Sequence, residues 1–165
     1  MFTIEVAAAF IEAERRRGRS IVFTNGVFDL LHPGHVRYLQ AARAQGDVLV
    51  VGVNSDRSVR ANKGLSRPVI PEQERAEVVS ALACVDAVAI LDDETPAAII
   101  ARLQPDVLVK GADCAADTIV GRDTVEARGG RVVRMPIEAG WSSSAIIEKS
   151  RAASKPGGSN GPDGP

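Results

Sequence analysis

Two histidines separated by two residues are the side chains whose type and spacing most directly suggest chemistry. His32 and His35 are the only histidines of the chain, and Gly34 lies between them. The stretch 23–35 is rich in Gly, Pro and Asn, so we expect a loop between an apolar strand and a helical pattern that starts at Val36. Open α/β sheets bind ligands at such strand–loop–helix junctions. Because glycine permits close backbone approach and a helix start offers N–H groups, we expect this loop to receive an anion.

Several kinds of active site are disfavoured by what the sequence lacks. A zinc site would need further ligands, but there is no third histidine, and Cys84 and Cys114 lie far from the loop. The sequence contains no GxGxxG motif after the first strand, no GxxxxGK[ST] motif and no GxSxG motif. We therefore predict no protein-built metal site, no standard dinucleotide or P-loop site, and no serine hydrolase elbow.

The remaining cations suit nucleotidyl transfer. When a phosphate oxygen attacks the α-phosphorus of a nucleoside triphosphate, negative charge grows on the α-phosphate and on the departing pyrophosphate, and positive groups can stabilise it. His32 and His35 can donate hydrogen bonds from the loop. Lys63 lies in the stretch 61–70, which we interpret as a mobile loop that closes over the phosphates. An imidazole beside a triphosphate should hold its proton more readily, because nearby negative charge favours the charged form.

Strand and helix patterns alternate along the chain. We expect strands at 20–24, 47–54, 85–91, 106–110 and 131–135. We expect helices at 4–17, 36–46, 72–83, 96–103, 118–128 and 142–151. This alternation predicts an α/β fold, a Rossmann-like doubly wound parallel sheet of about five strands. The carboxyl ends of parallel strands meet at one edge, so we expect the polar segments 24–29, 54–56, 110–113 and 140–144 to gather there around a nucleotide.

The totals favour one soluble domain. A length of 165 residues supports a single domain, which we place at 1–151, followed by a flexible Gly- and Pro-rich tail at 152–165. The net charge of −1 gives no global attraction for nucleic acid or a membrane, so any phosphate binding must be local. Neither a signal peptide nor a membrane span is indicated, and the two cysteines lack CxxC spacing, so we expect reduced thiols in a cytoplasmic protein.

The loop and the segments around it resemble a known family. GVFDLLHPGHVRYL, with its HxGH signature, resembles the cytidylyltransferase-like nucleotidyltransferases. VGVNSDRSVRANKG, RPVIPEQERAEVVSAL, DDETP, PDVLVKGAD and GWSSSAII are similar to blocks of the D-glycero-β-D-manno-heptose 1-phosphate adenylyltransferases. This resemblance covers about 23–147. It implies an enzyme that transfers AMP from ATP to that sugar phosphate, giving ADP-heptose and pyrophosphate for lipopolysaccharide or related glycans, with Mg²⁺ accompanying ATP.

The same resemblance implies roles for individual residues. It gives catalytic roles to His32, His35 and Lys63. It implies nucleotide-binding roles for Thr24, Asn25, Gly26, Phe28, Asp29, Gly34, Lys110, Gly111, Asp113, Ser142, Ser143 and Ser144. Asn54, Asp56 and Arg75 would contact the sugar phosphate, with Asn54 and Asp56 also close to the ribose.

Two departures from related sequences refine these expectations. Glycerol phosphate cytidylyltransferases carry an RTEGIST-type block, whereas Ile137 stands here in the place of its arginine. The heptose enzyme of many bacteria is fused to a sugar kinase, and this chain resembles the stand-alone form. We therefore expect a separate sugar kinase upstream, and homo-oligomer formation stays open. Alternative functions are a cytidylyltransferase acting on another phosphorylated alcohol and a non-catalytic nucleotide-binding regulator, although the intact HxGH and Lys63 argue against a regulator.

Some side chains have a structural alternative to a role in the site. Asp29 could cap its turn, and Arg75 could pair with acidic residues of its own helix. The serines at 142–144 could serve only as a helix N-cap. The roles of Arg67 and Trp141 stay open.

Overall fold

A parallel sheet forms the centre of the molecule. The computed structural model describes residues 3–92, 95–112, 119–136 and 142–153. Its five strands are β1 (Ile21–Gly26), β2 (Val48–Asn54), β3 (Ala87–Leu91), β4 (Val107–Gly111) and β5 (Arg131–Met135). They pair in the order β3-β2-β1-β4-β5, and every pairing is parallel. The predicted doubly wound α/β fold is thus confirmed.

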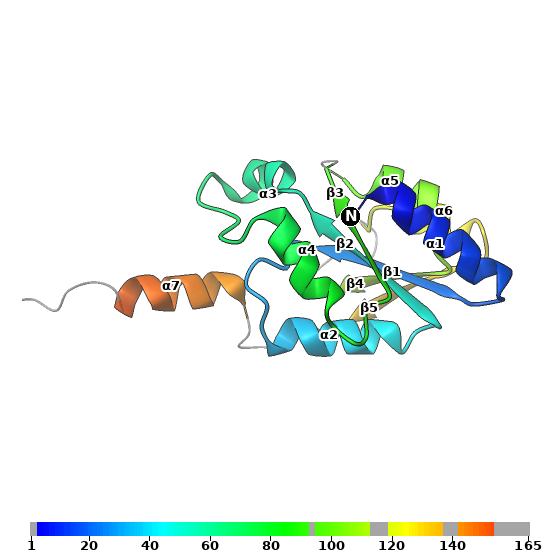
Figure 1. Cartoon of the computed structure of the whole chain (residues 1–165), viewed down its shortest axis with the longest axis horizontal. Coiled ribbons are helices and arrows are strands. Elements are labelled where there is room, and N and C mark those ends of the chain that lie inside the picture. The colour runs from blue at the N-terminus through cyan, green and yellow to red at the C-terminus, as the bar shows by residue number, and fades with distance from the viewer. Residues whose placement is uncertain (1–2, 93–94, 113–118, 137–141, 154–165) are drawn as a thin grey trace, which may run out of the picture.

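Helices cover both faces of the sheet (Figure 1). One face carries α1 (Ile4–Arg16), α5 (Ala97–Leu103) and α6 (Arg122–Glu126). The other carries α2 (Pro33–Arg43) and α4 (Glu72–Ser80). The remaining two described helices are α3 (Asp56–Lys63), which follows β2, and α7 (Ser143–Ala153), which extends away from the body of the domain in Figure 1.

The central strand β1 is buried from both sides because its side chains alternate. Ile21 and Phe23 pack in the core beneath α1 and α5, whereas Val22 packs in the core beneath α2 and α4. Thr24 is also fully buried, and its hydroxyl lies 2.8 Å from the Tyr38 hydroxyl of α2. The end of β1 is therefore a fixed platform for the loop that follows it.

Two local predictions around the histidine loop were wrong. The helix predicted from Val36 begins at Pro33, because His32 has extended backbone angles and caps it with Pro33 at the first helical position. Lys63 does not lie on a loop but closes helix α3, which Ser55 caps by accepting a hydrogen bond from the Ser58 N–H at 3.1 Å. The stretch 56–63 has only one large apolar side chain, so its hydrophobic periodicity gave no helical signal.

For two other helices the observed limits differ from the predicted ones. The predicted helix 118–128 is shorter, spanning Arg122–Glu126, and the last helix continues to Ala153, two residues into the predicted tail. The rest of that tail, 154–165, lies outside the described residues. In the described part of the chain, no helix is both long and apolar enough to cross a bilayer.

Candidate functional site

The ends of β1 and β4 define a crevice. The strand order runs in one direction from β1 to β3 and in the other from β1 to β5, so crossover connections diverge at this point and leave an opening beyond the carboxyl ends. Lys110 at the end of β4 donates from Nζ to Oδ1 of Asn25 at the end of β1. The Asn25 amide in turn donates to Oδ1 of Asn54, at the end of β2, at 3.4 Å. Three strand ends thus meet through polar side chains, as their positions in the sequence predicted.

A cavity of about 680 Å³ opens at this crevice, a size usual for ligand sites. The residues with predicted roles that line it are Asn25, Gly26, Phe28, Asp29, His32, Gly34, His35, Lys63, Lys110, Gly111, Ser142, Ser143 and Ser144. Residues without a predicted role also line it: Val27, Arg37, Tyr38, Ala41, Arg67, Met135 and Pro136. The predicted Asp113 lies outside the described residues, as do Ile137, Cys114 and Trp141.

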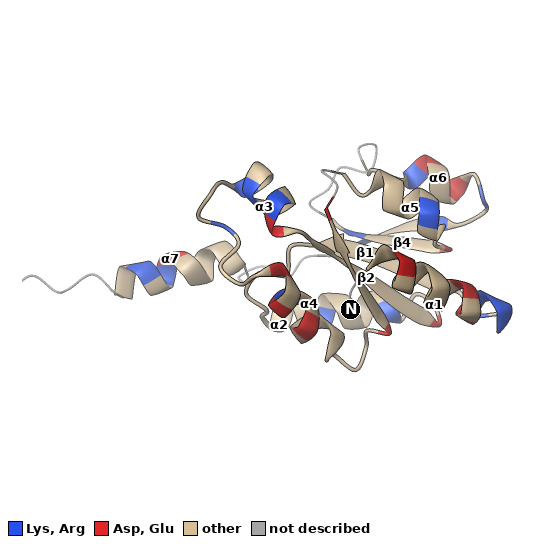
Figure 2. Cartoon of the chain, turned by 45° about the horizontal axis from the view of Figure 1, so that its top comes forward, with Lys and Arg blue, Asp and Glu red and all other residues tan. Residues whose placement is uncertain are grey.

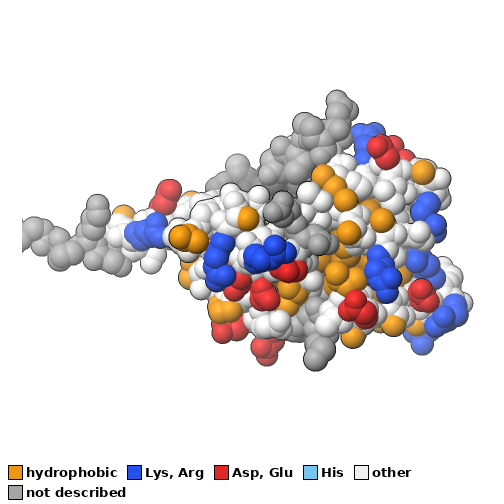
Figure 3. Space-filling view, turned by 90° about the horizontal axis from the view of Figure 1, so that it is seen from above, with side chains coloured by type: hydrophobic (Ala, Val, Ile, Leu, Met, Phe, Trp, Pro, Cys, Tyr) orange, Lys and Arg blue, Asp and Glu red, His pale blue; other side chains and the backbone are white. Residues whose placement is uncertain are grey.

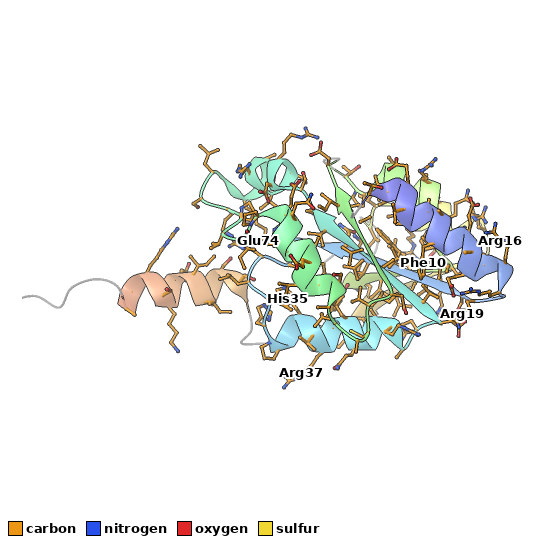
Figure 4. All side chains as sticks on the ribbon, viewed as in Figure 1. Phe10, Arg16, Arg19, His35, Arg37 and Glu74 are labelled. Atoms are coloured by element: carbon orange, nitrogen blue, oxygen red, sulfur yellow. The ribbon has the colours of Figure 1, made fainter. Side chains whose placement is uncertain are left out.

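The two histidines form a stacked pair at the start of α2. Their ring centroids are 3.8 Å apart and their planes differ by 18°. Nδ1 of His32 accepts a hydrogen bond from the His35 N–H at 3.4 Å, so a neutral His32 carries its hydrogen on Nε2. Figure 4 shows His35 on the side of α2 that faces the rest of the domain. The pair therefore places two imidazole rings at a helix start, on the wall of the cavity.

Phe28 holds the second histidine in place. Its ring meets the His35 ring edge-on, with centroids 5.4 Å apart and planes at 63°. The Phe28 backbone has φ of 49°, in the left-handed region that costs a side-chain-bearing residue about 1–2 kcal/mol. A Cβ on Gly26 would lie 3.1 Å from the Phe28 ring, so a larger residue there would require the ring to shift. This strained turn directs the aromatic side chain against His35.

Both histidines have lowered pKa values. Burial is the main cause for His35, and the charges of His32 and Lys63 add to it, lowering its pKa to about 4 although the Leu30 backbone acts in the opposite direction. Burial also lowers the pKa of His32. His35 is consequently neutral at pH 7 in the ligand-free chain, and its imidazole N–H bonds the Leu30 backbone. A polyphosphate placed beside it would add negative charge and raise this pKa.

Asp29 ties the segment after α3 to the histidine loop. Its buried carboxylate accepts hydrogen bonds from Nε of Arg67 at 2.7 Å and from the N–H groups of Val69 and Ile70 at 2.8 and 2.9 Å. Burial by itself would raise the pKa of Asp29, but the two backbone bonds and Arg67 outweigh burial and lower it. Asp29 is therefore an ionised acceptor that anchors a neighbouring segment as well as a residue that lines the cavity.

The three serines at the start of α7 make three different contacts. Ser142 accepts a hydrogen bond from the Ala145 N–H at 3.0 Å and so caps the helix. Ser143 donates to the Leu30 carbonyl at 3.2 Å. Ser144 accepts from Nη1 of Arg67 at 3.3 Å. The first turn of α7 is thus fastened to the cavity wall.

The cavity carries a positive balance of charge. Lys63, Arg67 and Lys110 line it, and Arg37 lies on the outer side of α2 (Figure 4). Figure 2 shows further cationic residues on α3 and on the segment after it, at the end of the molecule where α7 begins. Among the described lining residues the one acidic side chain is Asp29, which pairs with Arg67. Elsewhere the signs are mixed, as the face in Figure 3 shows. Attraction for an anion is therefore local.

The residues predicted to contact the sugar phosphate lie outside the described lining of this cavity. Arg75 is 1% exposed, and its guanidinium donates to the carbonyls of Ile70, Val27 and Asn54 and to the Asp56 carboxylate. No N of this guanidinium is left without a protein acceptor, so it holds three segments together. Neither Arg75 nor its partners Asn54 and Asp56 line the cavity, and the predicted pairing of Arg75 within its own helix is not what forms.

Some unassigned lining residues carried a signal in the sequence. Gly34, Tyr38 and Ala41 recur at spacings of four and three residues, so they share one face of the helix that begins at the histidines. Extending that face from the HxGH motif would have found Tyr38 and Ala41. Arg67 had no such signal, because its partners Asp29 and Ser144 are distant in sequence.

The fold and this cavity define an α/β domain of the nucleotidyltransferase type. The chain belongs to the family described as Cytidylyltransferase-like, whose model matches residues 23–149. It is 55% identical over 139 residues to the bifunctional protein HldE of Syntrophotalea carbinolica, covering 84% of this chain and 28% of the relative. It is 56% identical over 140 residues to the HldE of Hyphomonas neptunium, covering 85% and 29%. The chain thus spans less than a third of the length of these curated relatives.

Solved structures agree on the fold. A lipopolysaccharide core biosynthesis protein from Thermoplasma volcanium aligns with a TM-score of 0.60 and 29% identity, over 73% of this chain and 97% of that chain. Pantothenate synthetase from Thermus thermophilus aligns with a TM-score of 0.62 over 93% of this chain and 69% of its own. At 17% identity, the second likeness concerns the fold alone.

Proposed function

We propose that the chain transfers AMP from ATP to D-glycero-β-D-manno-heptose 1-phosphate, giving ADP-heptose and pyrophosphate. The observation that carries this proposal is the stacked His32–His35 pair in a cationic cavity at the switch point of the sheet. The sequence blocks that resemble the heptose adenylyltransferases support the choice of substrates. The relatives named HldE and the neighbour named a lipopolysaccharide core biosynthesis protein support the same choice.

The proposed reaction needs positive and hydrogen-bonding groups more than a base. An oxygen of the sugar phosphate forms a bond to the α-phosphorus of ATP, and the bond from that phosphorus to the oxygen bridging to the β-phosphorus breaks. Pyrophosphate leaves with the electron pair. Because the attacking phosphate oxygen is already anionic near pH 7, no proton has to be removed from it. His35 is neutral in the ligand-free chain, with a pKa of about 4, and the negative charge of a bound triphosphate raises that pKa, so we assign the protonated imidazole as a donor to the α-phosphate.

The lining residues divide into groups with separate proposed tasks. The charge of Lys63 lowers the pKa of His35, so the two side chains are close, and we place the Lys63 ammonium at the α-phosphate, where the attack occurs. The first turn of α7, which begins at the three serines, offers its backbone N–H groups to the β- and γ-phosphates. Lys110 and Gly111, at the end of β4, lie on the side proposed for the base and ribose.

Magnesium is proposed as part of the MgATP substrate. A resident Mg²⁺ needs a set of oxygen ligands, but the described cavity residues offer one carboxylate, Asp29, which is already bound to Arg67 and two backbone N–H groups. In the described part of the chain, no group of three or more His, Cys, Asp or Glu side chains is placed to hold a metal. The described residues therefore do not fit a resident ion, whereas phosphate oxygens of the nucleotide would hold it.

A panel of substrates tests the proposal. The purified chain is incubated with ATP, CTP, GTP or UTP and MgCl₂, with and without the heptose 1-phosphate, and pyrophosphate release is measured. We expect release with ATP and the heptose 1-phosphate together, and much less with CTP or without the acceptor. Equal rates with CTP would overturn the adenylyl assignment. Nucleotide binding without pyrophosphate release from any combination would favour the regulator.

A further inference from the structure

Arg67 lies where three segments of the cavity wall meet. Its side chain is 10% exposed, its Nε donates to Asp29 at 2.7 Å, and its Nη1 donates to Ser144 at 3.3 Å. Asp29 belongs to the histidine loop and Ser144 to the first turn of α7. Arg67 itself belongs to the segment after α3, which the Asp29 carboxylate also binds through the Val69 N–H. One guanidinium therefore connects the histidine loop to the start of α7.

The start of α7 depends on few contacts. None of the described side chains of α7 is buried, and the helix extends away from the domain in Figure 1. Its described side-chain bonds to the cavity wall are the one from Ser143 to the Leu30 carbonyl and the one from Arg67 to Ser144. Core packing cannot fix the orientation of this first turn. Among the described side-chain contacts, these two hydrogen bonds tie the first turn to the cavity wall.

We propose that Arg67 is a positioning residue that holds Ser144 and the first turn of α7 at the cavity, so that this turn can bind the terminal phosphates of a nucleoside triphosphate. This inference rests on the proposed function. Asp29 fixes the guanidinium, and the guanidinium fixes Ser144. Arginine suits this role because its planar fork places two donors at a set separation, whereas lysine carries one compact ammonium group.

The charge of Arg67 and its positioning role can be separated by substitution. Arg67→Lys keeps the positive charge and a partner for Asp29 but removes the second arm of the fork. Ser144→Ala removes the acceptor at the other end. If Arg67 acts through Ser144, the two changes remove the same interaction, and the double variant should behave like either single variant.

Binding of inorganic tripolyphosphate, measured by isothermal titration calorimetry, is the primary test. We expect Arg67→Lys and Ser144→Ala each to raise the Kd about tenfold, the scale of one hydrogen bond, and the double variant to raise it no further. Ser150→Ala, the same substitution farther along α7, is the matched control and should leave the Kd unchanged. Wild-type affinity in Arg67→Lys would show that charge alone matters. Additive losses in the double variant would show independent contacts. Either result overturns the proposal.

Two further measurements separate this role from general stability and from the proposed reaction. Thermal unfolding should give nearly the same Tm for Ser144→Ala as for wild type, because Ser144 is exposed. In the steady state, Ser144→Ala should raise the KM for ATP with little change in kcat. Tripolyphosphate binding requires no turnover, so failure of the adenylyl assignment would leave this test intact. A coupled loss of tripolyphosphate affinity would support positioning even if the acceptor were a different phosphate.

Discussion

Two arginine–aspartate pairs lie near the carboxyl edge of the sheet, and they differ in what their guanidinium groups still offer. In the Arg75–Asp56 pair the arginine side chain is 0% exposed, and it donates to three backbone carbonyls as well as to the carboxylate. In the Arg67–Asp29 pair the arginine lines the cavity, and it donates to a carboxylate and to one serine hydroxyl. One arginine is wholly occupied by the fold, and the other faces the ligand space.

The difference teaches that a buried arginine close to a site need not belong to the site. A guanidinium has five N–H donors, so its role depends on how many of them the protein itself uses. Arg75 joins β2, the loop after β1 and the segment before α4. Arg67 joins segments that surround the cavity. The two are eight positions apart in the sequence, and nothing in their immediate neighbours separates these roles.

The largest effect on stability should come from the scaffold arginine. Arg75→Met leaves the carbonyls of Ile70, Val27 and Asn54 without their donor and Asp56 without its buried partner, so we expect a loss of about 3–5 kcal/mol in the free energy of unfolding. Urea denaturation followed by circular dichroism measures it. The kcat per folded molecule should stay close to wild type. A stable Arg75→Met protein with impaired phosphate binding would remove the contrast between the two arginines.

Among the residues that line the cavity, His35 should have the largest effect on kcat. We expect His35→Ala to lower kcat by roughly 100-fold or more, about 2.7 kcal/mol of transition-state stabilisation, because a donor to the developing charge is lost. Single-turnover quench-flow measurement of pyrophosphate release would isolate the chemical step. Circular dichroism should show an intact fold. Normal turnover by this variant would contradict the proposed mechanism.

A smaller effect on stability should follow from neutralising the carboxylate of the cavity pair. Asp29→Asn keeps the size of the side chain but removes the charge that accepts hydrogen bonds from Arg67, Val69 and Ile70. We expect the free energy of unfolding to fall by about 1.5–3 kcal/mol, the range for hydrogen bonds to a charged group. Chemical denaturation at pH 7 checks it. A loss as large as that of Arg75→Met would show that the cavity pair is as much a part of the scaffold as the other pair.

The smallest effect concerns pH. The pKa of His35 is about 4 in the folded chain and near 6.5 when unfolded, so the unfolded chain binds more protons between these values. The stability that His35 contributes is complete above pH 6.5 and falls as the pH drops toward 4. The free energies of unfolding measured at pH 7 and at pH 5 should therefore differ less in His35→Gln than in wild type. Asp29, with its pKa lowered, keeps its contribution through this range. An unchanged pH dependence in His35→Gln would show that another group is responsible.

The sequence predicted those features that depend on local pattern. Short apolar runs between helical patterns located the five strands, and the strand at 131–135 has the same limits in the structure. Polar residues at strand ends located the cavity, because parallel strands end together. The start of α2 could have been predicted as well, since Pro33 after His32 is a usual first helical position.

Features that depend on distant partners escaped prediction. Helix α3 forms with Val59 as its one fully buried apolar side chain, so it produced no periodic signal. The resemblance to the heptose adenylyltransferases implied that Arg75 contacts the sugar phosphate. Its burial depends on which carbonyls the folded loops bring together. The contacts of Arg67 likewise join residues 38 and 77 positions apart, beyond the reach of any local pattern.

The central place of β1 in the sheet also affects how the chain folds during synthesis. Ile21 at the start of β1 donates to Asp106, a partner 85 residues later, just before β4. At a translation rate of about 5–20 residues per second, roughly 4–17 s pass between the synthesis of these two segments. During that interval the strand that leads to the histidines has one unpaired edge, a template for pairing with other chains. The part of the cavity wall that β4 contributes does not yet exist in this time, so a ligand of the cavity cannot stabilise the nascent domain through it.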